Sequence, residues 1–179
     1  MTLTFTKTKT AEEKGCHSDF HILNDKWTLW THLPHDTNWN IDSYKKIIDF
    51  QYAEEIISIL NVMPEKLVKN CMLFMMKDGI KPTWEDEHNK DGGCFSFKIH
   101  NKQVKSIWTS LCYSVAGETI SNDPLFIKSI TGLTISPKKN FCIIKIWMSD
   151  CENQNAVKII NIDGLSNQGC LFKKHLPEF

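Results

Sequence analysis

The sequence MLFMMKDGIKPTWEDEHNKDGGCFSFKIH, residues 72–100, holds two apolar stretches on either side of a long polar loop. Residues 72–77 are apolar enough for a buried strand, and residues 94–100 alternate between apolar and polar side chains. The loop between them, residues 78–93, carries glycine and proline turn signals. Trp84 stands in the middle of this loop, where core residues are not expected. The pattern predicts two strands joined by a loop that carries a site.

The segments before and after this stretch supply further elements. Residues 26–33 are rich in aromatic and β-branched residues and predict a strand, and residues 44–50 predict a second. Apolar residues then recur at helical spacing at Ala53, Ile56, Ile57 and Leu60. The same spacing runs from Val104 to Val115, with Gly117 as the expected helix end. We therefore expect one helix that begins near Ala53 and another that begins near Val104.

The C-terminal part predicts two more strands and a last helix. One strand lies around residues 127–135 and ends at Pro137, and the next covers residues 141–148. Along the second strand, Phe141, Ile143, Lys145 and Trp147 share a mixed face that is open to a ligand, while the other face is wholly apolar. Ser149 and Glu152 have the spacing of a capping box, which predicts a helix through Asn161.

The order of these elements favours one fold class. Strands and helices do not alternate regularly, which predicts an α+β fold with a mostly antiparallel sheet. Residues 1–19 begin with a threonine- and lysine-rich stretch of low apolar content and predict a disordered tail. Residues 20–179 contain no repeat or linker and predict a single domain.

Composition excludes several classes of protein. The 179 residues carry 21 basic and 21 acidic side chains, so nothing in the net charge attracts duplex DNA or a membrane surface. No apolar run approaches the roughly 20 residues of a membrane span and no secretory signal is evident, so we expect a cytoplasmic protein. Every basic residue is lysine, which leaves no guanidinium for bidentate phosphate binding. The cysteine and histidine spacings match no common zinc pattern, so no metal or cofactor is expected.

Trp84 and Glu85 indicate the kind of ligand that the loop binds. An aromatic face beside a fixed carboxylate suits a flat, positively charged ring with N–H donors. Seven-methylguanine is such a ring, because methylation at N7 makes it cationic and its N1–H and N2–H edge can donate to one carboxylate. A second tryptophan could complete a sandwich around it.

Four segments resemble the eukaryotic translation initiation factor 4E family of cap-binding proteins. They are LNDKWTLW (residues 23–30), the loop run through WEDEHNKDGG (residues 77–93), residues 108–118 and IWMSDCENQNAV (residues 146–157). The resemblance covers residues 21–157. It implies a curved, mostly antiparallel sheet of about eight strands, with helices on the convex back and a cap-binding slot on the concave face. It also implies capped mRNA as the ligand.

The resemblance assigns site residues one by one. It places the two stacking tryptophans at Trp39 and Trp84, the guanine-reading glutamate at Glu85, and the tryptophan beside the N7-methyl group at Trp147. Of three basic positions that bind the cap's triphosphate, only Lys138 is basic here, because Cys94 and Ile143 occupy the others. Lys139, Lys145 and Lys98 lie near enough in sequence to compensate. The phosphate contacts therefore differ from the family pattern.

The partner-binding surface differs as well. The family's exposed tryptophan on the first helix, which anchors a peptide of the scaffold factor 4G, corresponds to Ile57. The rest of the surface falls on His21, Ile22, Ala53, Thr109 and Ser110. Losing an aromatic anchor commonly costs about 2 kcal/mol of binding free energy.

Three hypotheses follow for the function. The first is a cap-binding factor of translation initiation that performs no covalent chemistry. The second is a divergent cap-binding repressor, or a protein-interaction module that no longer discriminates the cap and does not engage the usual scaffold factor. The third, a cysteine-dependent enzyme, has little support, because no cysteine has a recognisable histidine partner.

Overall fold

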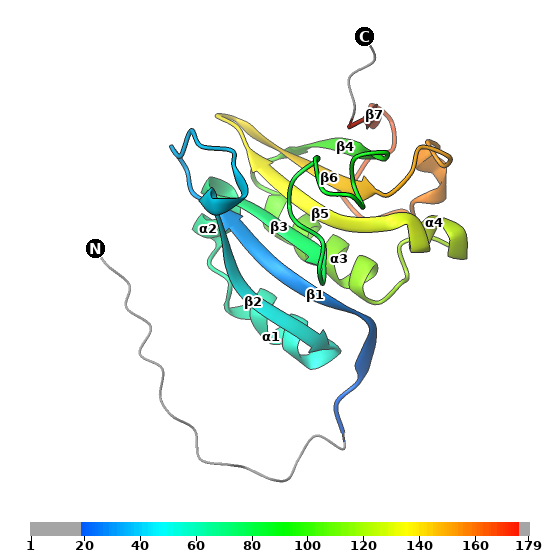
Figure 1. Cartoon of the computed structure of the whole chain (residues 1–179), viewed down its shortest axis with the longest axis horizontal. Helices are drawn as coiled ribbons and strands as arrows, with labels where there is room; N and C mark the ends of the chain where they lie inside the picture. Colours follow the sequence, from blue (N-terminus) through cyan, green and yellow to red (C-terminus); the bar gives the residue numbers. More distant parts are fainter. Residues whose placement is uncertain (1–18, 176–179) are drawn as a thin grey trace.

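A computed structural model describes residues 19–175 of the chain, and these residues form one curved sheet with helices behind it (Figure 1). Seven described strands pair antiparallel throughout, in the order β2-β1-β3-β5-β6-β4-β7. They are β1 (Ile22–His32), β2 (Tyr44–Tyr52), β3 (Met72–Lys77), β4 (Gly93–His100), β5 (Ile130–Pro137), β6 (Phe141–Met148) and β7 (Leu171–Lys174). The predicted α+β class is confirmed. The predicted tail, residues 1–19, lies outside the described residues except for Asp19.

The helices cover one face of the sheet. They are α1 (Ala53–Val62), α2 (Glu65–Asn70) and α3 (Val104–Ala116), while α4 (Pro124–Ser129) precedes β5. Between the helices and the sheet lies the main hydrophobic core, whose largest fully buried side chains include Trp27, Trp108 and Phe95. The helix α3, the longest in the described part of the chain, has 13 residues. No described helix has the length and apolar character needed to cross a lipid bilayer.

A smaller apolar cluster covers part of the opposite, concave face. Phe74, Met76, Ile80 and Trp147 are buried there, with Trp30, Met72 and Tyr44 packed against them. The loop between β3 and β4 passes in front of the sheet, and the loop after β1 projects beyond the ends of β1 and β2 (Figure 1). Because both faces of β3 are covered, its residues read as one apolar run rather than as an alternation.

Two sequence predictions need correction, and two helices were missed. The helix predicted from Ser149 is wrong: the Asp150 carboxylate accepts the Glu152 backbone N–H at 3.0 Å, and only the short 3-10 helix η2 (Ala156–Lys158) follows. The strand predicted from residue 127 begins at Ile130, because the Asp123 carboxylate caps α4 by accepting from Leu125 and Phe126. The short helices α2 and α4 were not predicted.

A glycine pair joins the β3–β4 loop to the sheet. A methyl group on Gly92 would overlap the backbone carbonyl of Met148, and one on Gly93 would lie 2.6 Å from the Lys173 carbonyl oxygen. Gly92 therefore lets the end of the loop approach the backbone of β6, and Gly93 lets the start of β4 approach the backbone of β7. The same pair ends the loop and starts β4, so it sets where the loop sits relative to the strands.

The start of α1 is tied to the start of β1. Glu55 accepts the backbone N–H groups of Gln51 and Tyr52, which caps the helix. His21 Nδ1 lies 2.7 Å from Glu54 Oε1, and the His21 backbone N–H donates to Glu54 Oε2. The hydrogen bond to Glu54 raises the pKa of His21 above 6.5, and the same hydrogen bond lowers the pKa of Glu54 below 4.5. This pair fixes the entry of the chain into the sheet.

The first prediction concerns Gly92. We expect Gly92→Ala to lower the free energy of unfolding by about 1–3 kcal/mol, because the added methyl group forces backbones apart. Chemical denaturation measures this change. The matched control is Asp91→Ala at the exposed neighbouring position, which should stay within about 0.5 kcal/mol of the parent. Equal stability of Gly92→Ala and the parent would rule out the close approach.

The second prediction concerns His21. In an NMR titration, the pKa of its imidazole should lie above 6.5, and Glu54→Gln should return that pKa toward 6.5. The contribution of His21 to the free energy of unfolding is complete below pH 6.5 and is lost as the pH rises through its raised pKa. The contribution of Glu54 is complete above pH 4.5 and is lost as the pH falls through its lowered pKa. The pair therefore stabilises the fold most between pH 4.5 and pH 6.5. Glu65→Gln on α2, which removes the same charge elsewhere, should leave the His21 titration unchanged; an unchanged titration in Glu54→Gln would contradict the pair.

Candidate functional site

Two loops over the concave face enclose a cavity of about 320 Å³. The loop after β1 contributes Trp39, Asn40 and Ile41, and the β3–β4 loop contributes Lys81, Thr83, Glu85 and Asp86. The structure thus brings together Trp39 and Glu85, two of the predicted ligand residues that lie far apart in the sequence. An indole and a carboxylate in one open cavity can hold a flat ligand that donates hydrogen bonds.

Trp39 is held by a histidine behind it. Its ring stacks on His32 with the ring centroids 4.4 Å apart and an interplanar angle of 3°. His32 is buried, and its Nε2 lies 2.8 Å from the Asn38 carbonyl oxygen, which fixes the imidazole. Trp39 nevertheless remains 57% exposed. One face of the indole is therefore supported, while much of its surface stays open for a ligand.

Two polar side chains hold the β3–β4 loop in shape. Asn89 is fully buried, and its amide donates to the carbonyls of Lys81 and Thr83. Asp86 accepts the backbone N–H groups of Lys81 and His88. Burial acts to raise the pKa of Asp86, but the hydrogen bonds from His88 and Lys81 outweigh it and the pKa is lowered. Both side chains serve the loop's conformation.

This loop presents Trp84 and Glu85 at the surface. Trp84 is 45% exposed, although it is not among the residues that line the cavity with Trp39. Burial, and to a lesser extent the charge of the Glu85 carboxylate, raises the pKa of Tyr44. Neither predicted stacking tryptophan lies in the core, in contrast to Trp27 and Trp108, which are fully buried.

Trp147 is much less accessible than the other predicted ligand residues. It shares a face of β6 with Lys145, as predicted, but it is only 7% exposed. The His175 ring packs against it at 4.7 Å, and His175 Nδ1 lies 2.7 Å from the Asn89 carbonyl oxygen. Burial lowers the pKa of His175, and the nearby Lys145 acts in the same direction. The indole N–H of Trp147 has no hydrogen-bond partner among the described residues.

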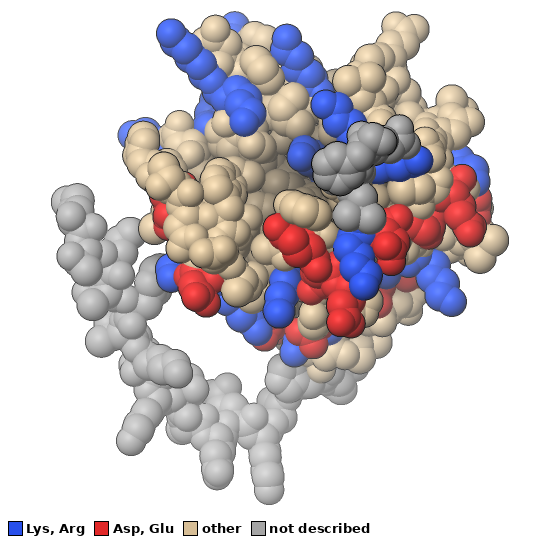
Figure 2. Space-filling model, turned by 45° about the horizontal axis from the view of Figure 1, so that its top comes forward, with Lys and Arg blue, Asp and Glu red and all other residues tan. Residues whose placement is uncertain are grey.

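A second groove, of about 500 Å³, gathers lysines. Lys98, Lys138 and Lys145 line it, as does Lys173 of β7, which sequence reasoning missed. Lys139 is exposed on the β5–β6 turn but is not among the lining residues. In Figure 2 the upper part of the face carries lysine side chains without acidic ones, and the acidic side chains lie lower, among further lysines. Three of the four predicted phosphate-binding lysines therefore converge.

The predicted partner surface lies on the helix side. Ile22 at the start of β1 is 66% exposed and Ile57 on α1 is 45% exposed. The Ala53 backbone N–H donates to the His21 carbonyl oxygen, which places these two residues side by side. On α3, which contacts α1, Thr109 is partly exposed and Ser110 is exposed. The surface combines the exposed apolar side chains of Ile22 and Ile57 with polar side chains, and it has isoleucine where the family has the anchoring tryptophan.

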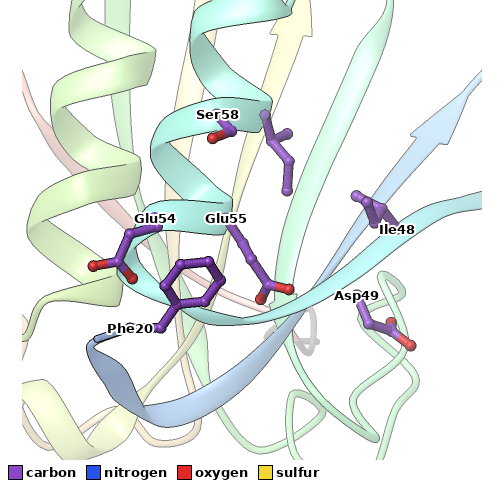
Figure 3. A pocket seen from close by; sticks show the side chains of 7 residues that line it. Phe20, Ile48, Asp49, Glu54, Glu55 and Ser58 are labelled. Atoms are coloured by element: carbon purple, nitrogen blue, oxygen red, sulfur yellow. The ribbon is translucent and has the colours of Figure 1, made fainter. Parts of the chain in front are cut away.

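A hollow of about 330 Å³ adjoins this surface where β2 meets α1 (Figure 3). Its rim carries Glu54, which pairs with His21, and Glu55, which caps α1. The remaining lining residues are Phe20, Ile48, Asp49, Ser58 and Ile59. The hollow is separate from the concave face.

Other functional residues that sequence reasoning missed are structural supports. His32 supports Trp39, and Asn89 and Asp86 shape the loop. The sequence signal for Asn89 and Asp86 was the WEDEHNK run itself. Short polar side chains such as Asp and Asn in a loop often accept or donate hydrogen bonds to nearby backbone and so fix the conformation of the loop. Within residues 19–175, no group of three or more His, Cys, Asp or Glu side chains could hold a metal ion.

Comparisons with known proteins agree with this geometry. The family model described as "Eukaryotic initiation factor 4E" matches residues 22–169. The chain is 32% identical over 142 residues to eukaryotic translation initiation factor 4E of Candida albicans, covering 74% of this chain and 66% of that protein. It is 30% identical over 159 residues to the Saccharomyces cerevisiae protein of the same name, covering 84% and 73%.

A solved structure of the same family has a similar fold. The complex of Ascaris suum eIF4E-3 with m7G cap superposes with a TM-score of 0.65 at 25% identity, covering 75% of this chain and 76% of that one. The chain thus shares with these proteins both its sequence pattern over residues 22–169 and its curved sheet. It belongs to the eukaryotic initiation factor 4E family.

Proposed function

We propose that this protein binds the 7-methylguanosine cap of messenger RNA and acts in translation initiation. The observation that carries the proposal is the cavity that Trp39 and Glu85 line together. Family membership supports it, as does the relative from Ascaris suum that was solved with m7G cap. The activity is binding, without covalent chemistry.

In this proposal the methylated base stacks on Trp39. Methylation at N7 gives the ring a positive charge, which strengthens its attraction to the electron-rich face of an indole. His32 holds Trp39 from behind, so little conformational entropy is lost on binding. We assign Trp84, which lies on the β3–β4 loop and is 45% exposed, to the opposite face of the base. Each stacking face contributes about 1–3 kcal/mol.

Glu85 reads the edge of the base. Its carboxylate accepts from N1–H and N2–H of guanine, a pair of donors that adenine does not offer at these positions. A charged acceptor makes these hydrogen bonds stronger than bonds between neutral groups. Trp147 contacts the N7-methyl group, and Lys98, Lys138 and Lys145 bind the phosphates, with Lys139 as a further cation at the turn. The resemblance of these positions to the family pattern supports the assignment.

The convex surface is the proposed partner site. His21, Ile22, Ala53, Ile57, Thr109 and Ser110 would contact a scaffold initiation factor or an equivalent of different sequence. The exposed Ile22 and Ile57 favour an apolar contact. Because Ile57 offers no indole, a second candidate function is a cap-binding repressor that does not engage the usual scaffold peptide. A scaffold-peptide affinity like that of other family members would exclude this second candidate.

The third prediction tests cap binding directly. Isothermal titration with 7-methylguanosine triphosphate should show tight binding by the parent, and Trp39→Ala, Trp84→Ala or Glu85→Ala should each lose about 1–3 kcal/mol. Unmethylated guanosine triphosphate serves as the ligand control and should bind more weakly. The proposal fails if the parent does not distinguish the two nucleotides, or if all three variants bind as the parent does.

The fourth prediction separates support from contact within the loop. Asp86→Ala removes the acceptor for the Lys81 and His88 backbone N–H groups, so it should weaken cap binding about tenfold by loosening the loop. Glu87→Ala removes a neighbouring exposed carboxylate and is the matched control; its affinity should change less than twofold. Titration calorimetry of both variants measures the difference. Equal losses would mean that general charge, and not loop shape, governs affinity.

A further inference from the structure

Strands β4, β6 and β7 bring side chains of the concave face into rows across the sheet. Ser96 lies opposite Lys145 on one side and opposite Leu171 on the other. Cys94 lies opposite Trp147 and opposite Lys173 in the same way. Residues directly opposite each other in antiparallel strands point to the same face. Lys173 therefore shares a row with Trp147 at two strand spacings, or about 10 Å.

The groove in which this row ends carries unbalanced charge. Lys98, Lys138, Lys145 and Lys173 line it, and no aspartate or glutamate is among its lining residues. None of these four lysines takes part in an ion pair within the described part of the chain. Lys98 lies over the Phe141 ring at 4.6 Å, which orients it without neutralising it. Four ammonium groups in one hollow attract a polyanion.

Lys173 is placed where the other lysines are not. Its row contains no other basic side chain, because the opposing positions hold the buried Cys94 and Trp147. Lys145 lies one row further along β6, and Lys98, opposite Ile143, lies one row beyond that. Of the four lysines that line the groove, Lys173 is therefore the one that shares a row with Trp147. Its side chain is exposed, so it is free to reach a ligand.

We propose that Lys173 is a further phosphate-binding residue, whose ammonium binds the polyphosphate chain of the ligand together with Lys145, Lys98 and Lys138. This inference rests on the proposed function for the identity of the ligand. The chemistry that the groove recognises is a linear polyphosphate, and that part is independent of the base. Lys173 thereby supplies a cation to the row in which Cys94 provides none.

The experiment uses inorganic triphosphate as the probe and titrates the full chain by NMR. Shifts of the Ser96, Lys145 and Lys173 amides should saturate in the parent, and Lys173→Ala should weaken binding about tenfold. The slope of log affinity against log salt concentration should be smaller in magnitude by about one in Lys173→Ala than in the parent. Lys174→Ala is the matched control: it removes the same charge from the next position of β7, whose side chain points to the other face, and should change affinity less than twofold.

A second arm uses 7-methylguanosine with and without its triphosphate. Lys173→Ala should bind the nucleoside as the parent does and the triphosphate about tenfold more weakly. The inference is overturned if Lys173→Ala binds inorganic triphosphate as the parent does, or if Lys174→Ala loses as much affinity. If the parent binds triphosphate but does not prefer the methylated base, the proposed function fails while the Lys173 result still stands.

Discussion

The backbone of Gly92 and Gly93 passes so close to β6 and β7 that no side chain fits there, and both parts of the concave face depend on this approach. On one side of the pair, the chain is the loop that carries Trp84 and Glu85. On the other side it is β4, which aligns Cys94, Ser96 and Lys98 with the neighbouring strands. A shift of β4 by one residue would turn these side chains to the other face of the sheet. The glycine pair therefore helps to set the position of the cavity lined by Trp39 and Glu85 relative to the lysine groove.

Much of the fold could be predicted because its strands show strong patterns. The alternation in β4 and β6 predicted which residues are buried, and Cys142, Ile144, Ile146 and Met148 are indeed fully buried. Two of the failures share one cause, which is a short polar side chain that binds nearby backbone. Asp150 takes the Glu152 N–H and prevents the helix predicted there, while Asp123 caps a helix at residues predicted to begin a strand. Periodicity does not report such local hydrogen bonds.

The site was predictable where the residue types were unusual, and less so where they were ordinary. Trp39 and Trp84 attracted attention because indoles in polar loops are rare, and both are exposed. Lys173 could not be singled out, since LFKK is a weak strand signal and the alignment with Cys94 exists only once β7 has paired with β4. His32 was also missed, because its role depends on the loop that folds Trp39 back onto it. Both roles depend on tertiary contacts, which residue types and periodicity do not report.

The packing of His175 on Trp147 has a consequence for the energetics of recognition. Trp147 is only 7% exposed, and the imidazole of His175 packs against its ring. In the proposed complex, a methyl group that contacts more of this indole would have to displace the imidazole and break the contact between His175 Nδ1 and the Asn89 carbonyl, in the same residue whose amide closes the β3–β4 loop. The affinity of that complex would then be the interaction with the base less the work of uncovering the indole. His175, which directly follows β7, would thereby contribute to the selection of ligands.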